Sequence, residues 1–173
     1  MRIHHSLFAV LITLCAMTAF ADEQAPVHMP TDAEQVAGLQ KMCADSLEVI
    51  KTRQANKSLF ERLGKRSKIE QLATKLLAAH TKNEKIGHMF AHVKKGVFVK
   101  NVTDFLVLGT GGKANYSGRD MASAHAHLKI TNGDFLSAGG DVKAVMAGMK
   151  YGENEVQEVL CSLASFIPVV VQK

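Results

Sequence analysis

The sequence predicts an all-α protein with a mainly aliphatic core. Only 3 of its 173 residues are proline, several segments combine helical spacing of apolar residues with capping signals, and none alternates long enough to form a strand. Apolar residues make up 47% and charged residues 21%, which is the composition of a folded chain and excludes wholesale disorder. Aromatic residues make up only 6% and tryptophan is absent, so aliphatic side chains must fill most of the core.

The first 21 residues are predicted to be a signal peptide. Arg2 precedes an apolar run from Leu7 to Phe20, and the small residues before Asp22 favour cleavage after Ala21. The run is shorter than the roughly 20 residues that span a membrane. We therefore expect export to the periplasm or the exterior, with no stable membrane insertion after cleavage. An uncleaved anchor is the alternative.

Residues 22–57 are predicted to be a linker followed by a helical extension. Thr31 and Glu34 form a capping box, in which each side chain satisfies a free backbone N–H of the other residue, and a helix to about Ala55 should follow. We expect its apolar face to dock on the rest of the chain, because a stripe of this kind usually marks a contact. A helix held away from the domain for a partner is the alternative. The face consists of Val36, Leu39, Cys43, Leu47 and Ile50.

Two cysteines remain after the signal peptide, Cys43 and Cys161. Export permits a disulfide, but a sequence does not show whether the two Cα atoms come close enough to form one. Cys161 lies beside Leu160 and Leu163 and is expected to be buried in either case. We weigh a disulfide between Cys43 and Cys161 as a possibility and leave it open, the alternative being that Cys43 acts as a small buried apolar residue.

The domain proper is expected to span residues 58–173 and to contain a series of short helices. Capping boxes at Ser58-Leu59-Phe60-Glu61 and Ser67-Lys68-Ile69-Glu70 predict two helix starts. Pro168 is expected to end the last helix, because proline has no backbone N–H to donate. The expected helices cover residues 58–64, 67–80, 95–108, 119–128, 131–151 and 153–167, with an irregular helical turn at 86–93.

Charge and motifs exclude several function classes. The net charge is +5, but the basic residues are scattered, so no nucleic-acid partner is expected. The sequence contains no HExxH, CxxC, GxSxG or paired-acid motif. His88 and His92 have the spacing of one helix face but lack a third ligand, and we interpret them as an exposed polar pair rather than a zinc site. His80 and His127 are expected to have no ligand role.

His125 differs from the other histidines in its surroundings. It lies in a segment of small residues, Met121-Ala122-Ser123-Ala124-His125-Ala126, which follows a glycine-rich loop. Small neighbours allow a flat group to come close, and Met121 and Leu128 could flank that group. The residues alone permit a haem ligand here, although a surface histidine is the simpler interpretation.

Several segments between Ser58 and Val171, about two thirds of the chain, together resemble a group 1 truncated haemoglobin. Their order and spacing match from Ile69 to Ile130 without a gap. The matching segments are Leu59-Phe60-Glu61-Arg62-Leu63-Gly64, Phe90, Gly111-Gly112, Tyr116-Ser117-Gly118-Arg119-Asp120-Met121, Ala124-His125 and Leu128-Lys129-Ile130-Thr131.

The resemblance implies a two-over-two helical sandwich around haem b, here with an extra N-terminal helix. His125 matches the proximal iron ligand, and Phe90 matches the phenylalanine that packs on the haem face. The expected haem-binding residues are Leu77, Phe90, Phe98, Asn101, Val102, Leu106, Met121, His125, Leu128 and Ile130.

The distal side of the site departs from the family pattern. Leu77 replaces the usual tyrosine, and Phe98 and Val102 occupy sites that usually carry glutamine. Asn101 stands where some relatives supply a sixth iron ligand, and Leu106 corresponds to a gate aromatic. The first Gly-Gly pair of the family is reduced to Gly64-Lys65. Leu77, Phe98 and Val102 cannot donate a hydrogen bond to a bound gas, so a dry distal wall is expected.

The sequence therefore predicts an exported haem protein that binds O2, NO or CO. It does not identify a reductase that would act on the iron. Two other functions remain open. One is nitric-oxide dioxygenase or peroxidase activity, and the other is a non-catalytic sensor or haem-handling module. The sequence identifies no catalytic residue and leaves the physiological ligand and the oligomeric state open, because a fold does not fix a function.

Overall fold

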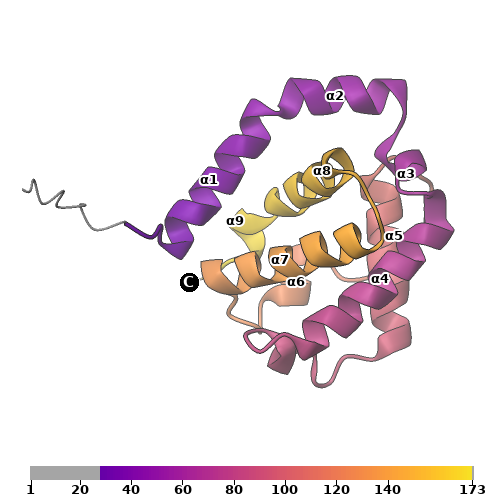
Figure 1. Ribbon diagram of the computed structural model, residues 1–173. Helices are drawn as coiled ribbons and strands as arrows, with labels where there is room; N and C mark the ends of the chain where they lie inside the picture. Colours follow the sequence, from indigo (N-terminus) through magenta and orange to yellow (C-terminus); the bar gives the residue numbers. More distant parts are fainter. Residues whose placement is uncertain (1–27, 173) are drawn as a thin grey trace, which may run out of the picture.

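The computed structural model of this chain describes residues 28–172, and within that range it is built from helices alone (Figure 1). This confirms the predicted fold class. The predicted signal peptide, residues 1–21, lies outside the described residues. The helices are α1 (Asp32–Asp45), α2 (Leu47–Asn56), α3 (Leu59–Arg62), α4 (Lys65–Lys82), the 3₁₀ helix η1 (Gly87–Phe90), α5 (Lys95–Gly109), α6 (Met121–His125), α7 (Asn132–Gly148), α8 (Glu153–Ala164) and α9 (Ile167–Val170).

The long helices form two packed pairs. α4 crosses α5 and also packs on α7, and α7 packs on α8 (Figure 1). None of the helices within residues 28–172 is both long and apolar enough to cross a bilayer.

The capping signals located most helix starts correctly. Thr31 and Glu34 form the predicted box at α1, and the Ser58 hydroxyl accepts from the Glu61 backbone N–H at α3. The predicted start at Ser67 is wrong, because α4 already begins at Lys65. Gly64 and Lys65 both adopt left-handed backbone conformations, with φ of 83° and 62°. This turn reverses the chain so sharply that Ser67 falls inside the first turn of the helix.

The N-terminal extension is two helices rather than one. Ser46 separates α1 from α2, and its hydroxyl accepts a hydrogen bond of 2.9 Å from Gln157 on α8. The break changes the direction of the chain, so that α1 and α2 arch around α8 (Figure 1). Leu47, expected on the docking face, is instead 48% exposed.

The expected docking of the extension is confirmed for α1. Val36 is buried in a small apolar cluster with Ala164 and Ile167, and Leu39 packs against the same cluster. Cys43 and Cys161 are disulfide-bonded, with their Cα atoms 5.4 Å apart. The structure therefore answers the question that the sequence left open, because docking of α1 on α8 brings together two positions 118 residues apart in sequence.

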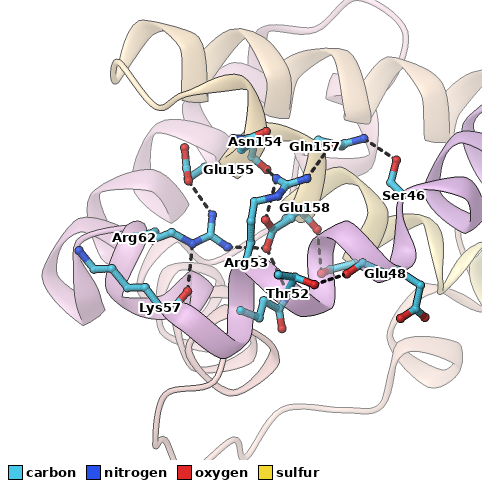
Figure 2. Close-up of polar contacts among 12 residues, drawn as sticks. Ser46, Glu48, Thr52, Arg53, Lys57, Arg62, Asn154, Glu155, Gln157 and Glu158 are labelled. Carbon is cyan, nitrogen blue, oxygen red and sulfur yellow. Dashed lines mark hydrogen bonds and ion pairs between the residues drawn. The ribbon is translucent and has the colours of Figure 1, made fainter.

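The second half of the extension is held by ion pairs as well as by the apolar side chain of Ile50, which is buried as expected. Arg53 of α2 and Arg62 of α3 converge on the carboxylate of Glu158 of α8, and Arg62 also pairs with Glu155 (Figure 2). The Glu158 side chain is fully buried. Burial alone would lower the pKa of Arg62, but hydrogen bonds to Glu158 and Glu155 outweigh it and raise that pKa above its usual value.

A closed core lies between α3, α4, α5, α7 and α8. We use that name for its fully buried members, Leu59, Leu63, Ile69, Leu72 and Met146, each with an exposed fraction of 0%. Gly112 allows the chain to pass this core closely, because a Cβ atom there would lie 2.7 Å from the Phe60 ring. Gly111 before it has a φ of 95°, a conformation that favours glycine. The Gly-Gly pair thus ends α5 and starts the loop toward α6.

The C-terminal helix is also divided differently from the prediction. α8 ends at Ala164, and Pro168 lies within the first turn of α9 instead of ending the preceding helix. Proline is tolerated there because the first backbone N–H groups of a helix have no partner within it. α9 packs against α6, so the end of the chain supports the helix that carries His125.

Candidate haem site

His125 ends the short helix α6 and has a defined hydrogen-bonding arrangement. Its Nδ1 lies 2.7 Å from the backbone oxygen of Met121. A carbonyl can only accept, so Nδ1 must carry the hydrogen of this bond. In the neutral ring, Nε2 then holds the lone pair and is available to a metal ion. The ring is half-buried, which leaves room for contact with a further group.

The helix α6 is shorter than the predicted range 119–128. It begins after Asp120, whose carboxylate accepts hydrogen bonds from the Ser123 backbone N–H (2.8 Å) and hydroxyl (2.7 Å). These bonds hold the pKa of Asp120 below its usual value. The helix ends because the Leu128 N–H bonds back to the His125 oxygen and Lys129 adopts a φ of 52°.

The loop before α6 explains the Tyr-Ser-Gly-Arg-Asp segment physically. The Tyr116 hydroxyl donates a 2.6 Å hydrogen bond to the Arg119 backbone oxygen, and its ring packs edge-on against Phe105 of α5. A Cβ atom on Gly118 would lie 2.5 Å from the Tyr116 oxygen, so only glycine fits under this ring. Tyr116 and Asp120 were matched only as parts of the family motif, and their role is to fix the position of α6.

Aromatic side chains from three elements meet around Phe90. The Phe90 ring of η1 lies edge-on to Phe98 of α5, with ring centroids 6.0 Å apart. On its other side, Phe90 stacks on His80 of α4, with centroids 5.1 Å apart. The structure therefore brings Phe90 and Phe98 together as the resemblance implied, and adds His80, which the sequence did not indicate.

The ten predicted haem-binding residues differ in their burial. Leu106 belongs to the tightly packed cluster that contains the closed core, whereas Leu77 is buried outside that cluster. The other eight are half-buried. These are Phe90, Phe98, Asn101, Val102, Met121, His125, Leu128 and Ile130.

None of these ten residues lines either of two surface hollows. These hollows, of about 460 and 470 Å³, are lined by other side chains, one between α4 and the turn from α7 to α8, the other between α4 and α5. Across residues 28–172 no group of three or more histidine, cysteine, aspartate or glutamate side chains could hold a metal ion. His88 and His92, the pair weighed as zinc ligands, are both exposed.

The chemistry of the site residues fits a haem group. A haem needs one oriented imidazole nitrogen and a surround of apolar side chains with surface left to cover. His125 supplies a nitrogen whose tautomer is fixed by Met121, and Phe90, Phe98 and Val102 supply apolar surface that packing inside the protein leaves half-exposed. The arrangement therefore has the donor and the kind of surface that the resemblance requires.

Solved structures of truncated haemoglobins have this fold. The truncated haemoglobin of Tetrahymena pyriformis in its Fe(III) form is 20% identical, with a TM-score of 0.65 over 68% of this chain and 100% of that chain. The 2/2 haemoglobin of Synechococcus sp. PCC 7002, in the cyanomet state and with covalently attached haem, is 19% identical, with a TM-score of 0.59 over 65% and 94%. No family model matches the sequence, and no curated protein matches it. The chain has the truncated haemoglobin fold, and its membership of group 1 stays a prediction.

Proposed function

We propose that this chain is an exported haem protein of the group 1 truncated haemoglobin type that binds O2, NO or CO. The single observation that carries this proposal is the hydrogen bond from His125 Nδ1 to the Met121 oxygen, 2.7 Å long. It fixes the ring orientation and leaves Nε2 as an electron-pair donor in a chain that has the truncated haemoglobin fold. Haem b, when bound through this nitrogen, supplies an iron site for a diatomic gas.

The distal residues of the chain would shape that site by excluding water rather than by donating hydrogen bonds. Leu77, Phe98 and Val102 have no polar hydrogen, so a gas beside them gains no charge-assisted hydrogen bond, which is worth about 1.5–3 kcal/mol. Asn101 is the polar side chain in this set, and asparagine is not a usual iron ligand. We therefore expect weak retention of O2 compared with relatives that carry distal tyrosine and glutamine.

The disulfide supports the proposed export. Disulfides persist in oxidising compartments and are rare in the reducing cytosol. Cys43 and Cys161 lie at bonding distance because α1 docks on α8. A signal peptide cleaved after Ala21 would deliver the chain to such a compartment. Mass spectrometry of the mature N-terminus and of non-reduced peptides from exported material tests both points, and an intact N-terminus with two free thiols would contradict them.

The decisive experiment compares two histidines on the same segment. The purified chain is loaded with haem, and its absorption spectrum is recorded in the ferric, ferrous and CO-bound forms. We expect His125→Ala to lose stoichiometric haem and the ferrous spectrum, whereas His127→Ala, which changes an exposed ring two residues away, should behave like the wild type. His88→Ala and His92→Ala serve as further controls. Normal loading of His125→Ala, or a wild type without a Soret band, overturns the proposal.

A steady-state assay then separates a gas binder from an enzyme. NO consumption is measured with the haem-loaded protein and an excess of a chemical reductant. We expect no turnover beyond stoichiometric binding. Sustained consumption that depends on O2 would replace this proposal with nitric-oxide dioxygenase activity.

A further inference from the structure

His80 is a buried imidazole that the proposed chemistry does not use. It lies on α4 one turn after Leu77, and only 8% of its surface is exposed. Its Nδ1 lies 2.8 Å from Oδ2 of Asp141 on α7. The carboxylate oxygen accepts, so Nδ1 carries the hydrogen of this bond and the rotation of the ring is fixed from one edge.

The carboxylate of Asp141 is itself fixed by a second residue. Asn83, at the end of α4, donates a 2.9 Å hydrogen bond from Nδ2 to the same oxygen of Asp141. The Asn83 side-chain oxygen accepts from the Ser137 hydroxyl (3.1 Å) and from the Lys85 backbone N–H (3.0 Å). These bonds tie α7 to the end of α4 and to the loop that leads into η1. Asp141 is therefore a rigid anchor for the His80 ring.

The face of the His80 ring meets Phe90. The two rings stack with centroids 5.1 Å apart and an angle of 25° between their planes. Phe90 also contacts Phe98, whose ring lies edge-on to it with an angle of 72° between the two ring planes. The bond to Asp141 fixes one edge of the His80 ring, and the face of the same ring stacks on Phe90. The orientation of Phe90 is thereby coupled to the contact between His80 and Asp141.

We propose that Asp141 and His80 act together as positioning residues that set the plane of Phe90 against the haem face. This inference rests on the proposed function, because the haem contact of Phe90 comes from the family resemblance. The device needs both properties of histidine. The ring supplies the stacking face, and the Nδ1 hydrogen supplies the bond that keeps this face in one plane.

Two substitutions separate these properties. His80→Phe keeps a stacking ring and loses the hydrogen bond, whereas His80→Asn keeps a donor near the Nδ1 position and loses the ring. We expect each to raise the rate of haem transfer to an apomyoglobin acceptor about tenfold and to shift the Soret band. Asp141→Asn, which retains an acceptor, should stay near the wild type. Asp141→Ala should match His80→Phe, and the double variant His80→Phe/Asp141→Ala should be no worse than either alone.

A second readout needs no haem. In the apo chain, hydrogen exchange is followed at the η1 amides of Met89 and Ala91, whose N–H groups bond within the turn. We expect His80→Phe to speed exchange there without a comparable change in the closed core. Equal exchange and haem transfer rates in wild type, His80→Phe and Asp141→Ala would overturn the proposal. The proposal also fails if the stacked ring alone holds Phe90 in place. In that case only His80→Asn, and not His80→Phe, would lose haem faster than the wild type.

The two failures can be told apart. If the wild-type chain binds no haem, the proposed function fails, and the exchange measurement still decides whether His80 and Asp141 hold η1. If the wild type binds haem and the variants match it in both readouts, only the positioning role fails. His92→Phe, an exposed histidine just after η1, is the matched control and should leave both readouts unchanged.

Discussion

The closed core lies between α3, α4, α5, α7 and α8, whereas the candidate haem site takes its residues mainly from α4, η1, α5 and α6, and the two regions are packed differently. Ile69 and Leu72 of α4 are fully buried by protein alone. Phe98 of α5 is also apolar but only half-buried, and Val102 stays half-buried although it packs against the cluster that contains the closed core. Protein interiors normally pack to a constant high density. The first region is therefore filled by protein side chains alone, whereas the second leaves part of its apolar surface exposed, as the proposed haem contact requires.

Polar groups are distributed differently in the two regions as well. Next to the closed core, Arg53 and Arg62 neutralise the buried carboxylate of Glu158. At the candidate site, His125 bonds through one nitrogen to a backbone oxygen and keeps the other available. A buried polar group whose hydrogen bonds are all satisfied helps to specify a fold, whereas a side chain that keeps an unused lone pair is suited to binding a metal ion.

The largest expected effect comes from Leu72→Ala in the closed core. We expect it to lower the free energy of unfolding by about 2–5 kcal/mol, because it leaves a cavity where the side chain is fully buried. The loss should be the same with and without haem. It is measured by urea denaturation of the apo and haem-loaded chains.

Phe98→Ala is the matched substitution in the candidate site. We expect a smaller loss than for Leu72→Ala in the apo chain, because the Phe98 ring is already half-exposed there. A further decrease in the free energy of unfolding should appear only in the haem-loaded chain. If Phe98→Ala destabilises the apo chain as much as Leu72→Ala does, the two regions are equally well packed without haem. The contrast between the closed core and the candidate site is then wrong.

The disulfide gives the second largest expected effect. Replacing both Cys43 and Cys161 by alanine should lower the free energy of unfolding by about 2–4 kcal/mol, since the bond restricts the unfolded chain over a long loop. We expect the haem spectrum to stay unchanged, because α1 docks on α7 and α8 away from α5. Chemical reduction of the wild-type protein is the control, and a shifted Soret band in either sample would connect the extension to the site.

Leu77→Tyr should have a still smaller effect on free energy and a specific effect on ligand binding. A phenol at this buried position gives the distal wall the hydrogen-bond donor that it lacks. We expect O2 dissociation to slow about tenfold, which corresponds to about 1.4 kcal/mol. Stopped-flow dissociation rates for O2 and CO test this, with CO as the ligand that should respond less. A wild-type O2 rate already as slow as that of tyrosine-containing relatives would point to Asn101 as the donor.

The smallest expected effect is a pH dependence at the cap of α6. The pKa of Asp120 lies below its usual value of 3.8, because the ionised carboxylate accepts from Ser123. A lowered pKa stabilises the folded state above the usual value, and this contribution is lost as the pH falls through the lowered pKa, that is, below about pH 4. We expect haem loss to accelerate in that range, and Asp120→Ala to show faster loss already at neutral pH. Asp120→Asn, which can still cap, should fall between the two.

Part of this molecule followed from sequence because the controlling interactions are local. A capping residue bonds to a backbone group three positions away, so Thr31 and Ser58 marked the starts of α1 and α3 without any tertiary information. The helix expected over residues 67–80 falls within α4, which spans Lys65–Lys82. The candidate ligand His125 was located by its small neighbours and by the family motif around it.

Only the tertiary structure decided features that depend on residues far apart in the chain. Ser46 interrupts the extension because Gln157 lies opposite it, and Cys43 pairs with Cys161 because α1 docks on α8. His80, which stacks on Phe90, bonds to Asp141, 61 residues further along. Local bonds and periodicity specify where helices begin and which face is apolar. Which helices meet, and at what angle, is decided by the packing of the whole chain, because many distant contacts of similar strength compete for the same surface.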